Sequence, residues 1–271
     1  MITIAYTSDI HLDFWVNPKA NATKQSQLIN NFIDNILSPP EADILIIAGD
    51  IGHYNKQNII FLKKLREYFS YIILTWGNHD LYLVSKKQEK EYKTSQNRLN
   101  DFKSKCHNID GIYLLDGDKI EINNISFGGS GLWYRVDDIK HWQNYMSDAT
   151  RIITPKITDI DFDNYGKQIK YRFDPNKLYQ SQIKILEELN NIDIFISHIA
   201  PILPKEATVV DNRYYYFDGQ QYIDNISPKI WVFGHIHKSY DFTYQDTRLL
   251  SNPLGYKNEN KGIFSFKTFI I

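Results

Sequence analysis

Three runs of largely apolar, β-branched residues stand out in the first third of the chain, and each run ends at polar residues. They cover residues 2–7, 43–48 and 71–76, and they end at Ser8-Asp9, Gly49-Asp50 and Gly77-Asn78-His79-Asp80. Short apolar runs without alternation are typical of strands that are buried on both faces, as in parallel sheets. The pattern predicts three buried strands that each present polar side chains at the carboxyl end.

The segments between these strands have apolar residues at helical spacing. They lie at residues 22–37 (Leu28, Ile29, Phe32, Ile33, Ile36) and 56–69 (Ile59, Ile60, Leu62, Leu65). Strand-helix-strand alternation predicts an α/β fold with parallel strands and right-handed crossovers. In such sheets ligands bind beyond the carboxyl ends of the strands, where all three polar clusters fall.

The middle of the chain has a weaker pattern. Residues 84–107 are polar and rich in Lys and Gln, which predicts a solvated surface helix without a function. Short strands are predicted at 112–115, 119–122 and 125–129, and the Asp-Gly and Asn-Asn signals between them suggest hairpins. Residues 133–172 lose periodicity, which predicts an insertion or lid with some helix.

Regular elements return in the last third. A helix is predicted at 175–190, because Asp174 is a good N-cap and Pro175 suits the first turn. Strands are predicted at 192–197, 230–233, 239–245, 247–250 and 262–270. No internal repeat or low-complexity linker is present, so we expect one domain over residues 1–271. Ser251-Asn252-Pro253-Leu254-Gly255-Tyr256 has turn chemistry and is interpreted as structural.

Composition narrows the class of protein. Hydrophobic residues make up 42% of the chain and charged residues 23%, as in ordinary globular proteins. The 31 basic and 32 acidic side chains nearly cancel, so no global positive field favours a polyanion. Cys106 is the one cysteine, which fits a reducing compartment. The N-terminus does not resemble a signal peptide, and no apolar stretch is long enough to span a membrane. We therefore expect a cytoplasmic protein.

Histidines are concentrated at the predicted strand ends. Six of the eight lie in five clusters, namely Asp9-x-His11, Gly49-Asp50-x-x-His53, Gly77-Asn78-His79-Asp80, Ser197-His198 and Gly234-His235-x-His237. Imidazoles, carboxylates and an amide without thiolates form a ligand set for borderline divalent metals. Glycine before Asp50, Asn78 and His235 would let the backbone pass close to a bound phosphate.

This ordered series resembles the calcineurin-like metallophosphoesterase superfamily, whose motifs are D-x-H, G-D, G-N-H-[ED], a lone H and G-H-x-H. The match anchors the chain from Asp9 to His237, and general architecture alone covers residues 81–196. The resemblance implies a four-layer αββα sandwich, in which two facing mixed β-sheets are flanked by helices.

The resemblance also implies a dinuclear metal site. Asp9, His11, Asp50 and His237 would hold one ion, and Asp50, Asn78, His198 and His235 the other, with Asp50 bridging. Manganese is the first expectation, with Fe, Zn, Co and Ni as alternatives. The implied reaction is hydrolysis of a phosphodiester or a small phosphorylated metabolite, by in-line attack of a hydroxide that bridges the metals.

Three further residues are catalytic candidates. By family likeness His79 faces the substrate, where it can donate a proton to the leaving oxygen, and the adjacent Asp80 is a candidate to orient it. His53-Tyr54 stands where protein Ser/Thr phosphatases of the superfamily carry Asp-Arg. The break-repair exonuclease branch instead carries a histidine there and also reads G-N-H-D. Protein phosphatase activity is therefore disfavoured, and phosphodiesterase or nuclease activity is favoured.

Two alternatives stay open. His53 and Asp80 favour a DNA or RNA nuclease, while the neutral charge and the lack of an evident DNA-binding domain disfavour it. A non-catalytic interaction module on the same fold is the other alternative, and the intact His79 and complete ligand set argue against it. Substrate specificity is expected in the segments 130–172 and 200–222, where Trp133, Tyr134 and Arg135 are candidates to line a pocket.

Overall fold

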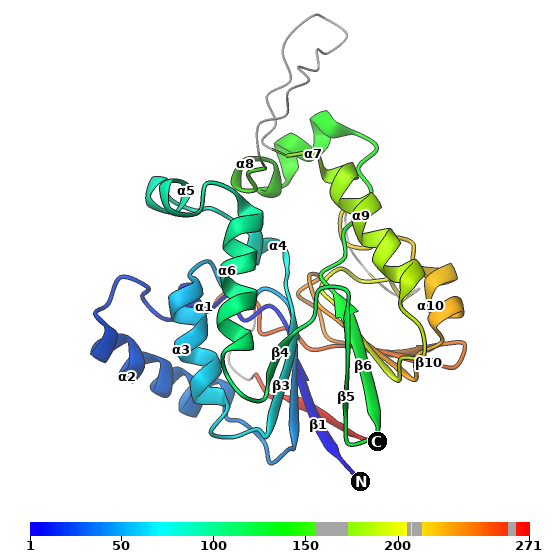
Figure 1. Cartoon of the computed structure of the whole chain (residues 1–271), viewed down its shortest axis with the longest axis horizontal. Helices are drawn as coiled ribbons and strands as arrows, with labels where there is room; N and C mark the ends of the chain where they lie inside the picture. Colours follow the sequence, from blue (N-terminus) through cyan, green and yellow to red (C-terminus); the bar gives the residue numbers. More distant parts are fainter. Residues whose placement is uncertain (155–172, 205–206, 208–212, 260–263) are drawn as a thin grey trace, which may run out of the picture.

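Two mixed β-sheets form the centre of the molecule (Figure 1). The computed structural model describes residues 1–154, 173–204, 207, 213–259 and 264–271. The first sheet has the order β11 (Lys267–Ile270), β1 (Thr3–Thr7), β2 (Ile44–Ala48), β3 (Tyr71–Thr75) and β4 (Ile112–Leu114). The second has the order β5 (Asp118–Ile122), β6 (Ile125–Ser130), β7 (Ile194–Ser197), β8 (Ile230–Phe233), β10 (Thr247–Ser251) and β9 (Tyr240–Tyr244).

Parallel pairing dominates around the predicted strand ends. Strands β1 to β4 are mutually parallel, and so are β6, β7, β8 and β10. Antiparallel strands close the sheets at their edges, where β11 pairs with β1, β5 with β6 and β9 with β10. The carboxyl ends of the parallel strands therefore collect at one edge of each sheet.

The alternation of side chains explains why the strand sequences are apolar throughout. In β2, Ile44 and Ile46 lie in the core between the two sheets, whereas Leu45 and Ile47 lie in the core beneath the helices. All four are fully buried. A strand that is covered on both faces needs apolar residues at every position, since successive side chains point to opposite faces.

Helices cover the outer faces of both sheets (Figure 1). Around the first sheet lie α1 (Leu12–Trp15), α2 (Ala22–Phe32), which continues as a π-helix at Ile33–Leu37, α3 (Asn55–Leu65), α4 (Asn78–Leu81), α5 (Lys86–Tyr92) and α6 (Ser95–His107). The remaining helices are α7 (Ile139–Tyr145), α8 (Asp148–Arg151), α9 (Pro175–Glu188) and α10 (Gln220–Ile226). The αββα sandwich implied by the resemblance is confirmed.

One predicted connection is wrong and another is confirmed. Strands β5 and β6 form a hairpin, with Asn123 and Asn124 in left-handed conformations at φ 53° and 62°. Strands β4 and β5 belong to different sheets, so the Asp116-Gly117 turn crosses between sheets and does not close a hairpin. A turn signal sets a change of chain direction, but the partner of the next strand depends on tertiary packing.

The predicted lid lies partly outside the described residues. Residues 133–154 include α7 and α8, and residues 155–172 are not described. None of the helices in the described ranges has the length and apolar character needed to cross a bilayer.

Candidate metal centre

The predicted ligands meet where five strand ends converge. Asp9, Asp50 and Asn78 follow β1, β2 and β3 of the first sheet, while His198 follows β7 and His235 follows β8 of the second. Each of these residues is at most 7% exposed, so the cluster lies in the interior at the junction of the sheets. Residues from opposite ends of the sequence thereby become neighbours.

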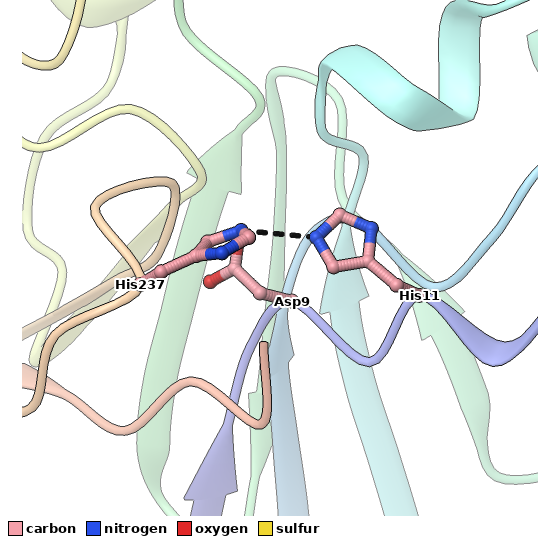
Figure 2. A group of neighbouring side chains, drawn as sticks. All are labelled: Asp9, His11 and His237. Atoms are coloured by element: carbon pink, nitrogen blue, oxygen red, sulfur yellow. Dashed lines mark hydrogen bonds and ion pairs between the residues drawn. The ribbon is translucent and has the colours of Figure 1, made fainter. Parts of the chain in front are cut away.

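One group of donors joins the two ends of the chain. The Nε2 atoms of His11 and His237 lie 3.0 Å apart, and Nε2 of His237 lies 3.3 Å from Oδ1 of Asp9 (Figure 2). Their nitrogen and oxygen atoms lie within 4.8 Å of one another. These three side chains point to a common centre, as ligands of one ion would.

A second group adjoins the first through Asp50. Its Oδ2 atom lies 3.4 Å from Nε2 of His198 and 3.8 Å from Nε2 of His11. The amide oxygen of Asn78 lies 3.0 Å from Nε2 of His198. Asp50 therefore contacts donors from both groups, which supports the bridging role that the resemblance implies.

His235 is oriented by a carbonyl group. Its Nε2 atom lies 3.0 Å from the carbonyl oxygen of Tyr214, so Nδ1 is the ring nitrogen left for an ion. The ring lies beside that of His198, with centroids 5.1 Å apart. The backbone N–H of His235 donates to both carboxylate oxygens of Asp9, at 3.1 Å each. His235 thus lies next to the second group and fixes a member of the first.

Strained backbone is concentrated at the site. Five of the seven predicted ligands have positive φ values: Asp9 51°, His11 45°, Asp50 56°, His235 70° and His237 54°. This region is unfavourable for residues with a Cβ, and such strain typically occurs at functional sites. The tight turns after the strands thus direct side chains that are close in sequence, such as Asp9 and His11, toward the same small volume.

Glycines permit the close approach of the strand ends. A Cβ on Gly77 would lie 2.2 Å from Oδ1 of Asp50, and one on Gly49 would lie 2.6 Å from Nδ1 of His198. The sequence predicted that these glycines admit a phosphate. Within the described residues, the lack of a Cβ at Gly49 and Gly77 makes room for the side chains of His198 and Asp50.

Burial and neighbouring charges shift the pKa values of the site. Burial alone would lower the pKa of His237, but the carboxylates of Asp9 and Glu259 raise it to about 10. Likewise, burial opposes ionisation of Asp50, but His198 outweighs it and holds the Asp50 pKa well below its usual value. In turn, Asp50 raises the pKa of His198 to about 9 despite burial. The carboxylates are therefore held in their charged form.

The donor set fits divalent metal ions. Burial lowers the pKa values of His11 and His235 to about 4, so both rings are neutral at physiological pH and retain a lone pair. Among the described residues, Nδ1 of His11 has no hydrogen-bond partner, while Nε2 of the same ring lies toward His237 and Asp50. Two carboxylates, an amide oxygen and four imidazoles suit Mn, Fe, Co, Ni or Zn. Confining so many polar groups together is costly unless ions pair with them.

A hydrogen-bonded chain connects His79 to a carboxylate. Oδ2 of Asp13 lies 2.7 Å from Nδ1 of His53, and Nε2 of His53 lies 2.9 Å from Nδ1 of His79. Nε2 of His79 lies 3.3 Å from the hydroxyl of Tyr256. Both histidines line a cavity that opens above the site. The geometry places His53 behind His79, with Asp13 behind both.

Asp80 anchors the backbone of the site. Its carboxylate accepts hydrogen bonds from the backbone N–H groups of Asp50 and Gly77, at 2.9 and 2.8 Å. It is 2% exposed and does not line the cavity. This geometry assigns Asp80 to positioning of the Asp50 and Asn78 loops, and its predicted catalytic role gains no support from contact with the cavity.

The prediction of a solvated helix at residues 84–107 is wrong on one face. Arg98 of α6 is fully buried, and its guanidinium donates to the carbonyls of His79, Asp80, Tyr82 and Gly52. Leu99, Phe102 and Cys106 of α6 are also buried. Charge patterning missed this role, because an arginine that satisfies loop carbonyls resembles a surface arginine in sequence.

Three more supporting residues were not predicted. Asp148 of α8 is fully buried and accepts hydrogen bonds from Asn78, Tyr82 and Tyr134. Its contact with the Asn78 amide nitrogen directs the amide oxygen toward His198.

Glu259 accepts from Nδ1 of His237 at 2.6 Å. Tyr256, predicted to be part of a structural turn, contacts both His79 and the ring of His11.

A cavity of about 830 Å³ opens above these residues. Its floor includes Asp50, Asn78, His79, His235 and His237. Its walls carry Phe14, Tyr82, Tyr145, Met146, Tyr215, Tyr256 and Arg151. The volume is typical of sites for small organic ligands, which span about 300–1,000 Å³.

Comparisons with known proteins agree with this arrangement. The chain is 26% identical over 281 residues to uncharacterized protein L509 of Acanthamoeba polyphaga mimivirus, covering 96% of this chain and 93% of that protein. Its fold is similar to a crystal structure of phosphopantetheinyl hydrolase (PptH) from Mycobacterium tuberculosis, with a TM-score of 0.61 and 15% identity. That match covers 99% of this chain and 95% of the other.

The family assignment follows from the sequence profile. Residues 2–239 match the model of the calcineurin-like phosphoesterase family, and this range contains every predicted metal ligand. The chain belongs to the calcineurin-like phosphoesterase family.

Proposed function

We propose that the protein is a dinuclear metal-dependent phosphoesterase that hydrolyses a phosphodiester or a small phosphorylated metabolite. The observation that carries this proposal is the convergence of seven donor residues from five strand ends, four of which (Asp50, Asn78, His235 and His237) line the floor of one cavity. Three sets of donor atoms there, each spanning no more than 4.8 Å, overlap through shared residues. Overlapping sets are what two neighbouring ions require.

Each ion would have its own ligands. Asp9, His11, Asp50 and His237 would hold one, and Asp50, Asn78, His198 and His235 the other. Bound divalent ions supply charge neutralisation for the phosphate and a water of lowered pKa. Manganese remains our first expectation for the native metal.

His79 is the residue proposed to deliver a proton to the leaving oxygen. Its Nδ1 atom is engaged by His53, so Nε2 is the atom directed to Tyr256 and the cavity. Burial lowers the pKa of His79 well below its usual value, while the negative charge of a bound phosphate acts in the opposite direction. The ring can therefore hold a proton when substrate is bound and release it readily.

Asp13 and His53 position this acid. Asp13 accepts from the backbone N–H of His53 at 2.9 Å and also contacts its ring nitrogen at 2.7 Å. Two contacts from one carboxylate fix both the loop and the ring. A fixed His53 in turn selects the orientation of His79 in which Nε2 faces the substrate.

A nuclease is the second candidate. The 2.9 Å contact between His53 and His79 favours it, since the exonuclease branch of the superfamily carries a histidine at the place of His53. The formal net charge of −1 disfavours a long polyanionic substrate, because binding of a nucleic-acid backbone depends on positive charge.

The test is hydrolysis by metal-stripped protein to which manganese is returned. Bis(p-nitrophenyl) phosphate, p-nitrophenyl phosphate, a labelled oligonucleotide and a phosphopantetheinyl ester would be assayed in parallel. The last is included because the structurally similar protein from Mycobacterium tuberculosis is a phosphopantetheinyl hydrolase. Metal-dependent cleavage of the diester or the phosphopantetheinyl ester is the expected result. Oligonucleotide cleavage alone would favour the nuclease. Absence of any metal-dependent turnover would contradict the proposal and favour a non-catalytic interaction module.

A further inference from the structure

The cavity is larger than the cleavage of one phosphate group requires. At about 830 Å³ it extends from the metal ligands to a wall formed by α8 and the end of α7. Among the described residues that line it, Arg151 of α8 is the single side chain with a permanent positive charge. None of the predicted metal ligands belongs to α8, so Arg151 is separate from the proposed metal-binding residues.

Arg151 lies close to His79 through one intervening ring. Its guanidinium carbon is 5.8 Å from the centroid of the Tyr82 ring, and that centroid is 4.5 Å from the centroid of His79. These two distances place the guanidinium carbon no more than about 10 Å from the centroid of the His79 ring, the proposed proton donor. The hydroxyl of Tyr82 is bonded to buried Asp148, so the ring beneath Arg151 is held in place.

The guanidinium forms no ion pair with any carboxylate in the part of the chain that the structure describes. Other exposed arginines differ. Arg135 contacts the carboxylate of Asp137 at 2.7 Å, and Arg248 makes two contacts with Asp241 at 2.8 and 2.7 Å. A planar group with five N–H donors and no carboxylate partner is well suited to bind a phosphate through two hydrogen bonds.

We propose that Arg151 binds a second phosphate group of the substrate, distinct from the phosphate that is cleaved. This inference rests on the proposed function, and it narrows the substrate class to phosphate esters that carry a further phosphate group in the same molecule. The proposed metal ligands and His79 would contact the first phosphate, and Arg151, which lines the same cavity, would contact the second.

The experiment uses two substrates that differ by one phosphate. They are the p-nitrophenyl ester of thymidine 5′-phosphate with a free 3′-hydroxyl, and the same ester with a 3′-phosphate. Release of p-nitrophenol is measured with the manganese-loaded full chain. Both compounds contain the same scissile bond and the same leaving group, so a difference in kcat/KM reports recognition of the second phosphate alone.

We expect the wild-type protein to have a higher kcat/KM for the 3′-phosphorylated ester. Arg151→Gln should lower kcat/KM for that ester by about tenfold or more, because the variant loses a charge-assisted pair of hydrogen bonds. The ester without the second phosphate should change less than about twofold. Arg151→Lys should retain part of the preference. The control is Arg135→Gln, since Arg135 is exposed and lies outside the cavity; both esters should be unaffected.

Two results would overturn the inference. A wild-type protein that cleaves both esters equally well would show that no second phosphate is recognised. An equal loss on both esters in Arg151→Gln would show that Arg151 acts on the scissile phosphate. Failure of the wild type to cleave either ester, or bis(p-nitrophenyl) phosphate, would instead contradict the proposed function itself.

Discussion

At the scale of single residues, adjacent positions have different tasks. Asn78 and His79 are consecutive, but the Asn78 side chain contacts His198 whereas the His79 ring contacts His53 and Tyr256. The backbone N–H of His79 also donates to Oδ1 of Asp50 at 2.8 Å. We propose that the strand exit separates a side chain for the metals, Asn78, from a side chain for the substrate, His79, and variants can test the two roles.

His79→Ala is expected to lose most turnover while metal content stays unchanged, because His79 contacts the substrate side of the cavity. Asp50→Asn is expected to lose both, because Asp50 contacts donors of both metal groups. Turnover of a diester and metal content by elemental analysis are the measurements, with exposed His107→Ala as the control. Equal metal loss in the His79 and Asp50 variants would contradict these roles.

Asp13→Asn is expected to reduce turnover most where the leaving group is poor. Positioning of His79 matters for a poor leaving group that needs a proton, and hardly for p-nitrophenolate. The variant's loss of kcat, relative to wild type, should be about tenfold or more greater for methyl phenyl phosphate than for methyl p-nitrophenyl phosphate. Asp137→Asn, which alters an exposed carboxylate, is the control. A uniform loss on both esters would indicate that Asp13 only stabilises the loop.

At the scale of secondary-structure elements, α6 supports the site from outside it. The four carbonyls that Arg98 binds belong to the loops after β2 and β3, which carry Asp50 and Asn78. The residues that follow a strand end cannot pair within the sheet, so their polar backbone groups need another partner. A buried arginine serves four of them at once.

Arg98→Met is therefore expected to be strongly destabilising, since it leaves several buried carbonyls without a donor. The free energy of unfolding should fall by about 3 kcal/mol, as for the loss of several buried hydrogen bonds. Urea denaturation followed by circular dichroism measures this change. Lys105→Met, on the exposed face of the same helix, should change stability by less than about 0.5 kcal/mol. Similar effects of both substitutions would refute the role of Arg98.

At the scale of the whole molecule, the site joins the two sheets. Asp9, Asp50 and Asn78 belong to exits of the first sheet, and His198 and His235 to exits of the second. Apolar packing between the sheets brings the exits together, through residues such as Ile46 and Ile196. Ions at the junction would add a polar connection to this apolar one.

Removal of the metal should therefore lower the melting temperature. Binding of an ion to the folded chain at 100 times its Kd adds about 2.7 kcal/mol, which corresponds to a shift of about 5 °C or more in a chain of this size. Differential scanning calorimetry with and without manganese measures the shift. Asp50→Asn should abolish the response to manganese. A wild-type melting temperature that does not respond would contradict an ion held between the sheets.

The amino-acid sequence by itself predicted most of the strands and the residues that we propose as metal ligands. A strand buried on both faces requires consecutive apolar residues, and its exit requires polar residues and glycine, so both signals are local. The order of the five polar clusters then sufficed for the family, which the profile match over residues 2–239 confirms. That residues 1–271 form one domain, and that the protein is cytoplasmic, stay predictions.

The tertiary structure alone decided how the ligands are supported. Asp13 contacts a histidine 40 positions away, Asp148 contacts Asn78 across 70 positions, and Tyr256 contacts His79 across 177. Each supporting residue is an ordinary Asp or Tyr whose local sequence is unremarkable for its task. Its role depends on which strand exits the packing of two sheets brings together, and hydrogen bonds act over about 3 Å in space whatever the separation in sequence.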